Sequence, residues 1–308
     1  IKPANTSTHH CLCITYHTPP NNITHIIIEL IASLLIYSSS SETNDETTSD
    51  RNLHSKFRFD PTQVRLNNLG QPATIPNNHA AQSPTFAKMS ANYIEFAPSV
   101  LTLLGEGEII FSGAETATGG DLAIDFQKAK FAGSNDVFLT IPLSEVSVGN
   151  YDWVRVSLAY QEGNINFVSS GNELSGTLAS FVGYNSYITA FDLNGSEISV
   201  NGNRAQGFWA FESLGFSTSG QAPEGATTVP NPLFATSPIP QGSCVVTGQF
   251  ENGLTITGEE TNDVEVILSF SVNNSFEWVE VNADGKFEPE AGETVVDMGL
   301  RGLIPVVQ

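Results

Sequence analysis

Hydrophobic and polar positions alternate along much of the chain from His54 onward. Short stretches place apolar or β-branched residues at every second position, among them DVFLTIPL, YDWVRVSLAY, CVVTGQF and DVEVILSFSV. A period of two is typical of strands that bury one face. Turn-forming pairs such as Asn194-Gly195 and Asn252-Gly253 interrupt the pattern. The sequence therefore predicts an all-β fold, an antiparallel β-sandwich of the immunoglobulin-like or jelly-roll-like kind.

Two segments depart from this alternation. Thr85 to Val100 comes closest to the apolar spacing of three and four that a helix requires, and it is the best helix candidate. The Pro-rich stretch 221–242 cannot form a central strand, because proline lacks a backbone donor. We expect it to be a long surface loop or a seam between two β-units. The folded part is thus predicted to be residues 52–308, as one β-sandwich domain or two such units.

Residues 1–51 are predicted to be a leader followed by a tether. The apolar run 26–36 is too short to span a membrane but suits the hydrophobic region of a signal peptide, and an acidic Ser/Thr-rich stretch follows it. This layout resembles a bacterial lipoprotein leader, with Tyr37 where the acylated Cys would stand. We expect export to the periplasm, the outer-membrane surface or the medium. The leader offers surface anchoring, and no transmembrane span is predicted.

Composition narrows the function classes. The chain has 12 Lys and Arg against 33 Asp and Glu, a formal charge of −21, which would repel nucleic acid. Beyond residue 50 the only thiol is Cys244 and the only imidazoles are His54 and His79. These are too few residues to build a catalytic triad or a three-His metal site. We therefore predict that the protein is not an enzyme. A glycosidase that uses a pair of carboxylates is the catalytic alternative.

The acidic segment 280–293 is the sharpest local motif. Oxygen-bearing side chains stand at 280, 282 and 284, and Gly285 permits a sharp turn, as in loops that wrap calcium. The predicted ligands are Asn282, Asp284, the carbonyl of Lys286 and Glu293, with Glu288 acting through water. The usual bidentate position is Ala291, two residues before Glu293. A plain β-hairpin with an acidic turn explains the same residues.

Residues Phe57 through Tyr160 resemble the first part of the MbnP-like family, periplasmic or surface proteins linked to copper handling. The similar features are KFRF, the His79 motif NHAAQ, MSANYIE at 89–95 and the strand entry GNY at 149–151. The resemblance implies a β-sandwich outside the cytoplasm and copper binding that involves His79. Soft or imidazole ligands beyond residue 50 are limited to a short list: His54, His79, Met89, Cys244 and Met298. The leader and the C-terminal segment are similar to those of Bacteroidota surface proteins.

Taken together, these features predict an exported, acidic binding or interaction protein with a calcium loop at 280–293. Its ligand is an unknown protein or glycan. The first alternative is an MbnP-like copper-binding periplasmic protein, and the second is the carboxylate-pair glycosidase.

Overall fold

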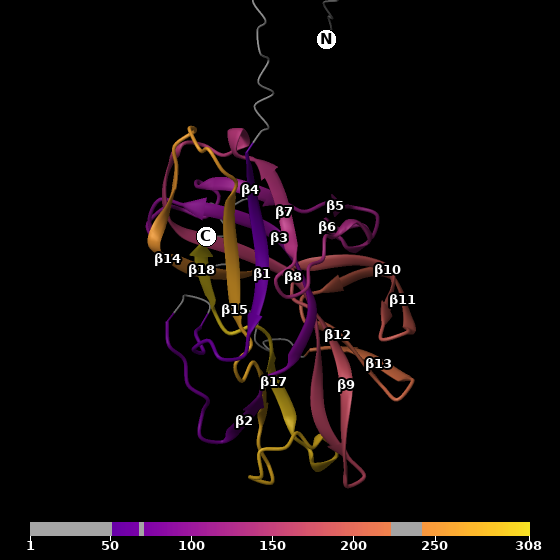
Figure 1. The fold of residues 1–308 in the computed structure, drawn as a ribbon. Helices are drawn as coiled ribbons and strands as arrows, with labels where there is room; N and C mark the ends of the chain where they lie inside the picture. The colour runs from indigo at the N-terminus through magenta and orange to yellow at the C-terminus, as the bar shows by residue number, and fades with distance from the viewer. Residues whose placement is uncertain (1–50, 68–70, 223–241) are drawn as a thin grey trace, which may run out of the picture. The chain divides into compact units, whose positions relative to one another are not determined.

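The computed structural model describes residues 51–67, 71–222 and 242–308, and Thr48–Gln308 form one compact unit. Strands make up most of the described residues (Figure 1). They are β1 (Asn52–Asp60), β2 (His79–Gln82), β3 (Thr85–Ala97), β4 (Glu108–Ser112), β5 (Glu115–Thr116), β6 (Ala123–Asp125), β7 (Val137–Pro142), β8 (Gly149–Ser169), β9 (Asn172–Phe181), β10 (Asn185–Leu193), β11 (Ser196–Ala205), β12 (Phe208–Ser213), β13 (Phe216–Gln221), β14 (Cys244–Ile256), β15 (Val264–Ser271), β16 (Phe276–Val279), β17 (Thr294–Met298) and β18 (Leu303–Val307).

Two sheets enclose the largest core. Sheet A has the order β18-β15-β1-β7, and sheet B contains β4-β3-β8, with β14 beside the first half of β8 and β9-β12-β13 beside its second half. In Figure 1 the strands of sheet A cross those of β3, β8 and β14 at a large angle. Side chains such as Phe57, Phe96, Val154 and Leu268 fill the space between them. The prediction of an all-β sandwich is confirmed.

The second half of sheet B is covered on both faces. Tyr160, Phe181 and Phe208 are paired neighbours, so they share one face, and sheet D (β11-β10-β6-β5) packs on it. Ile165 and Phe211 lie on the opposite face, which sheet C (β17-β16-β2) covers. Alternation alone produces this arrangement, because successive side chains of a strand point to opposite faces.

Three two-residue turns close hairpins of sheets B and D. Each turn puts both central residues at positive φ: Ser170-Gly171, Asn194-Gly195 and Leu214-Gly215. This conformation matches the right-handed twist of the flanking strands. Asn194-Gly195 was predicted from the sequence, whereas Leu214 is an unusual residue for such a position.

The helix expected at Thr85 to Val100 is wrong, because Thr85–Ala97 is strand β3. From Met89 to Ala97 every residue of β3 is buried on both faces, so its apolar residues do not alternate. Register shifts between Ser90/Ala91 and Ala91/Tyr93 interrupt the period of two, so the apolar spacing resembles that of a helix. No helix in the described ranges is long and apolar enough to span a membrane. Residues 1–50 of the predicted leader and residues 223–241 of the Pro-rich stretch lie outside the described residues.

Candidate functional site

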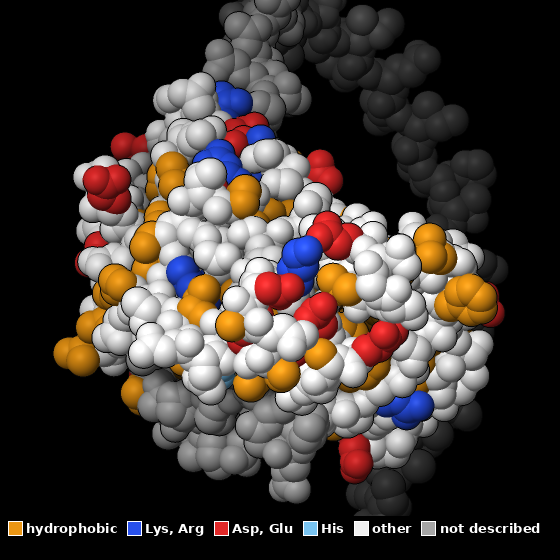
Figure 2. Space-filling view, turned by 90° about the horizontal axis from the view of Figure 1, so that it is seen from below, with side chains coloured by type: hydrophobic (Ala, Val, Ile, Leu, Met, Phe, Trp, Pro, Cys, Tyr) orange, Lys and Arg blue, Asp and Glu red, His pale blue; other side chains and the backbone are white. Residues whose placement is uncertain are grey.

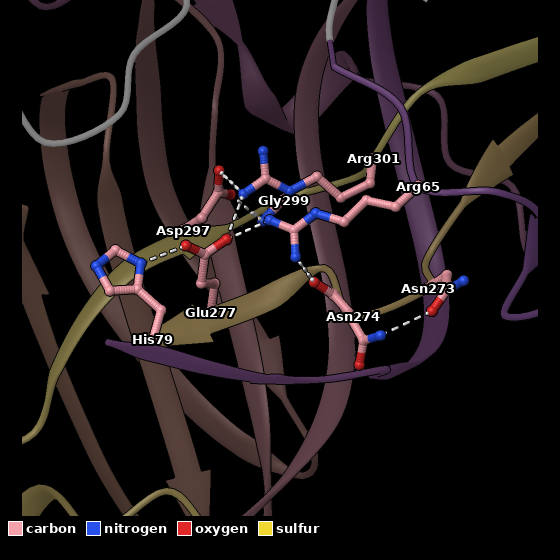
Figure 3. A network of polar contacts seen from close by, with 8 residues as sticks. All are labelled: Arg65, His79, Asn273, Asn274, Glu277, Asp297, Gly299 and Arg301. Carbon is pink, nitrogen blue, oxygen red and sulfur yellow. Dashed lines mark hydrogen bonds and ion pairs between the residues drawn. The ribbon is translucent and has the colours of Figure 1, made fainter. Parts of the chain in front are cut away.

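Glu277 is the centre of a buried polar network on sheet C (Figure 3). In β16, Phe276 and Trp278 point into the core against sheet B, so Glu277 faces the other way. Glu277 stands opposite Ala81 of β2 and Asp297 of β17. Arg65 and Arg301, from the segments before β2 and after β17, reach the same carboxylate.

The contacts around Glu277 engage both of its oxygens. His79 Nδ1 lies 2.5 Å from Oε1, while Arg65 Nη2 and Arg301 Nη2 donate to Oε2, the latter at 3.2 Å. Arg301 Nη2 also lies 2.6 Å from Asp297 Oδ2. Arg65 Nη1 donates to the carbonyl of Asn274 at 2.9 Å. The network therefore ties Arg65 and His79 to residues 274–301, which are distant from them in sequence.

The pKa values of the two carboxyl groups of the network shift in opposite directions. Burial works to raise the pKa of Glu277, but hydrogen bonds from His79 and Arg65 and the charges of both arginines outweigh it and lower the pKa. For Asp297, burial raises the pKa, and Arg301 and the Gly299 N–H offset only part of that effect. Glu277 is therefore the group that holds the negative charge opposite the two guanidinium groups.

His79 has the geometry of an oriented imidazole. Its Nδ1 is bonded to the buried Glu277 carboxylate, and its side chain is 18% exposed. A carboxylate at one ring nitrogen fixes the tautomer and aims the other nitrogen outward, which suits a metal ligand or a proton acceptor. In Figure 3 the far side of the ring points away from the network.

The other soft ligands are not grouped around His79. Met298 stands opposite Phe276 and packs on the apolar face of sheet C, the reverse of the His79 face. Met89 is fully buried in the main core, and His54 contacts Thr140 and Asp263 instead. Across residues 51–67, 71–222 and 242–308, no three His, Cys, Asp or Glu side chains form a group that could hold a metal ion. Copper binding at His79 stays a prediction.

The acidic segment 280–293 forms a loop between β16 and β17 whose carboxylates accept hydrogen bonds from the backbone. Glu280 Oε1 accepts from the N–H groups of Asp284 and Gly285 at 2.9 and 3.0 Å. Glu293 accepts from Val281 at 3.0 Å and from Glu288 at 2.6 Å. Because these bonds cross the loop, the two glutamates determine its shape.

The predicted calcium ligands lie on this loop but engage one another and the protein. Asn282 Nδ2 donates to Glu288 Oε2, and Asp284 Oδ1 accepts from the Lys286 N–H at 3.0 Å. The side chain of Lys286 pairs with Glu173 on β9 at 2.6 Å. The loop is further attached to β8 through the Val168 N–H, which donates to the carbonyl of Phe287 at 2.8 Å. Calcium at these residues is not tested by this arrangement and stays a prediction.

A groove of about 510 Å³ lies where two hairpin turns meet β8 and β9, and sequence reasoning missed it. Its walls are the Asn194-Gly195 and Leu214-Gly215 turns. Buried Glu212 joins the two walls, because its carboxylate accepts from Asn194 Nδ2 at 2.5 Å and from the Gly215 N–H at 2.7 Å. The remaining lining residues are uncharged: Asn164, Ser175, Gly176, Thr177, Ser196 and Ser213. Glu212 is thus the only carboxylate in the lining of the groove.

On the face shown in Figure 2, acidic side chains are scattered among a few basic ones and several hydrophobic ones. Comparison of the chain with models of known families, with curated proteins and with solved structures gives no match. The fold and the geometry of its sites are therefore the basis for any proposal about function. The resemblance to the MbnP-like family stays a prediction.

Proposed function

We propose that this protein is an exported binding module that holds a neutral, hydroxyl-rich ligand such as a glycan in the groove between the two hairpin turns. The supporting observation is the composition of that groove: uncharged amide and hydroxyl side chains surround one carboxylate that is already hydrogen-bonded. Groups of this kind exchange hydrogen bonds with sugar hydroxyls, and the volume lies within the usual range for ligand pockets. The loop at 280–293 acts in this proposal as a calcium-stabilised element.

Binding is favoured over hydrolysis by the number of carboxylates in the groove. Glycosidases of the common kind need two carboxyl groups on either side of the bond that is cleaved. The groove lining supplies only Glu212, and both of its oxygens are engaged by the walls. A ligand would therefore be held without being cleaved.

A glycan array with a parallel assay for released reducing sugar tests this function. We expect saturable binding of at least one glycan without sugar release, and a roughly ten-fold weaker affinity in Asn164→Ala, since a lining amide is lost. Asn172→Ala is the matched control, because Asn172 lies at the start of β9 and is not part of the groove lining. Steady sugar release would reject a binding-only role. Glycan binding that Asn164→Ala leaves unchanged would show that the groove is not the binding site.

The copper-binding alternative is favoured by a different observation, the carboxylate that orients His79. If the protein handles copper, the purified chain retains the metal, and His79→Ala loses it. His54→Ala is the matched control, since His54 contacts Thr140 and Asp263 at another place in the fold. Metal content measured on both variants tests the copper-binding alternative. Equal copper in the two variants would show that His79 is not a copper ligand.

A further inference from the structure

Strand β13 is an open edge of sheet B. It pairs with β12 through Phe216–Gln221, and no strand in the described part of the chain pairs with its other side. Residues 216–219 are all exposed, and Phe216 is 82% exposed. An edge of this kind presents backbone donors and acceptors that another extended segment can join.

β13 lacks the features that protect edge strands from pairing. Proteins usually blunt such edges with charged side chains, proline, bulges or very short strands. Phe216–Gln221 contains no charged residue, no proline and no register shift. The other edge strands of the described sheets each have such a feature: Pro305 in β18, Pro142 in β7, Glu108 in β4, Glu197 and Arg204 in β11, Asp297 in β17, a register shift in β14, and lengths of two and four residues in β5 and β2.

The turn before β13 adds an apolar side chain at a strained position. Leu214 has φ 53° and is 75% exposed. Non-glycine residues other than Asn and Asp are disfavoured in this region, and an exposed Leu gains nothing from burial there. Strain of this kind is typical of binding surfaces. Leu214 and Phe216 together present apolar surface at one end of the β13 edge.

The two faces of β13 differ in character. Phe216, Thr218 and Gly220 share a face with Trp209, because Trp209 is paired with Gly220. A Cβ atom at Gly220 would lie 2.7 Å from Cζ2 of Trp209, so the indole ring lies over the glycine. A strand added beside Gly220 would therefore find an aromatic surface on this face. The opposite face offers the small polar side chains Ser217 and Ser219.

The charge of the surrounding chain indicates the partner. No Lys or Arg occurs between Arg204 and Lys286, whereas this interval contains ten Asp and Glu residues from Glu212 to Asp284. The net charge of −21 therefore favours a basic segment as the partner. A second copy of the chain is disfavoured, because each copy has a net charge of −21.

We propose that β13 is a docking site for an extended peptide strand of a partner protein in which apolar residues alternate with Lys or Arg. The peptide extends sheet B, placing its apolar side chains beside Phe216 and Trp209 and its basic ones toward the serine face. This surface adjoins the groove, because Leu214 lies at the end of the β13 edge and also lines the groove, whereas Phe216 is not in the groove lining.

The test uses a synthetic peptide of alternating Val and Lys residues and the full chain. We expect saturable binding, slower amide hydrogen exchange at 216–221, and a roughly ten-fold or greater loss of affinity in Phe216→Lys. Val148→Lys is the matched control: Val148 is 68% exposed and outside β13, so the same charge change should leave affinity within roughly two-fold. The same peptide with every second backbone nitrogen methylated should not bind, because it cannot form the ladder of backbone hydrogen bonds with β13.

Other results overturn the proposal. These are no saturable binding of the Val-Lys peptide, equal binding of the N-methylated peptide, or equal losses in Phe216→Lys and Val148→Lys. Concentration-dependent dimers that Phe216→Lys disrupts would assign the edge to a second copy instead. Because Phe216 is not in the groove lining, glycan binding measured on Phe216→Lys reports separately on the proposed function.

Discussion

Glu277 is a single buried carboxylate that fixes the positions of several charged and polar side chains. It neutralises two arginines that come from opposite ends of the described chain and orients the imidazole of His79. The Nε atoms of Arg65 and Arg301 are buried without a hydrogen-bond partner among the described residues. Arg65 therefore depends on Glu277 for its counter-charge, whereas Arg301 also pairs with Asp297, and an uncompensated buried charge would be costly.

Glu277→Gln should lower the free energy of unfolding by about 3–5 kcal/mol at neutral pH, because it removes the counter-charge of the buried Arg65 guanidinium. Urea denaturation measures this loss. The exposed Glu173→Gln, which breaks only the surface pair with Lys286, is the control and should change stability little. An equal effect of the two substitutions would contradict the buried-network assignment.

The pH dependence of stability follows from the sign of the Glu277 shift. Its pKa in the folded state is lowered from the ordinary value of 4.5, so the unfolded chain binds the proton more readily. The stabilisation is fully present above the unfolded pKa and is lost as the pH falls through the folded pKa. Urea midpoints recorded between neutral pH and acid should therefore drop less steeply in Glu277→Gln than in the parent.

Cys244 should be chemically inert in the folded protein. Burial raises the pKa of its thiol to about 12, with a smaller contribution from the charge of Asp297. The thiolate is the reactive form, and at pH 8 it is nearly absent. With Cys11→Ser and Cys13→Ser in place, a thiol reagent at pH 8 should leave the native chain unmodified and label it at once in urea. Rapid labelling of the native chain would contradict the raised pKa of this partly buried thiol.

At the scale of elements, the 280–293 loop offers the clearest experiment. If it binds calcium, saturating ion stabilises the fold by about 2.7 kcal/mol at one hundred times the dissociation constant. The melting temperature should then rise with calcium in the parent and stay constant in Asp284→Ala. Asp263→Ala, outside the loop, is the control and should keep the calcium response. A melting temperature that calcium leaves unchanged in the parent would show that the loop is held without calcium, by its own hydrogen bonds and by its contacts with β8 and β9.

The elements that the sequence predicted are those that keep a regular period of two. Alternation marked β7, the first part of β8, and β15, because each has polar residues between its apolar ones. It failed for β3, where register shifts between Phe86/Lys88, Ser90/Ala91 and Ala91/Tyr93 interrupt the period of two. The groove could not be predicted either. Its walls are adjacent only because Glu212 joins two turns, and nothing in the local sequence reports that contact.

At the scale of the whole molecule, β1 makes the fold depend on both ends of the described chain. It lies inside sheet A, parallel to β15 on one side and antiparallel to β7 on the other, and Leu53 stands beside Val264. Non-local pairing of this kind is formed late and slowly in folding. β8 then links the main core to the core under sheet C, since Val154 belongs to the first and Ile165 to the second.

This connection predicts that the two cores unfold together. Phe57 is fully buried in the main core and stacks on Phe138 with ring centres 4.4 Å apart, so Phe57→Ala should cost about 3–5 kcal/mol. With Trp153→Phe and Trp209→Phe in place, fluorescence reports Trp278 beneath sheet C, far along β8 from the substitution. Its urea midpoint should fall by the same amount as the midpoint of the far-ultraviolet signal, because a continuous β8 cannot unfold in one half alone. A Trp278 transition that stays at its original midpoint would instead divide residues 52–308 into two independent β-units.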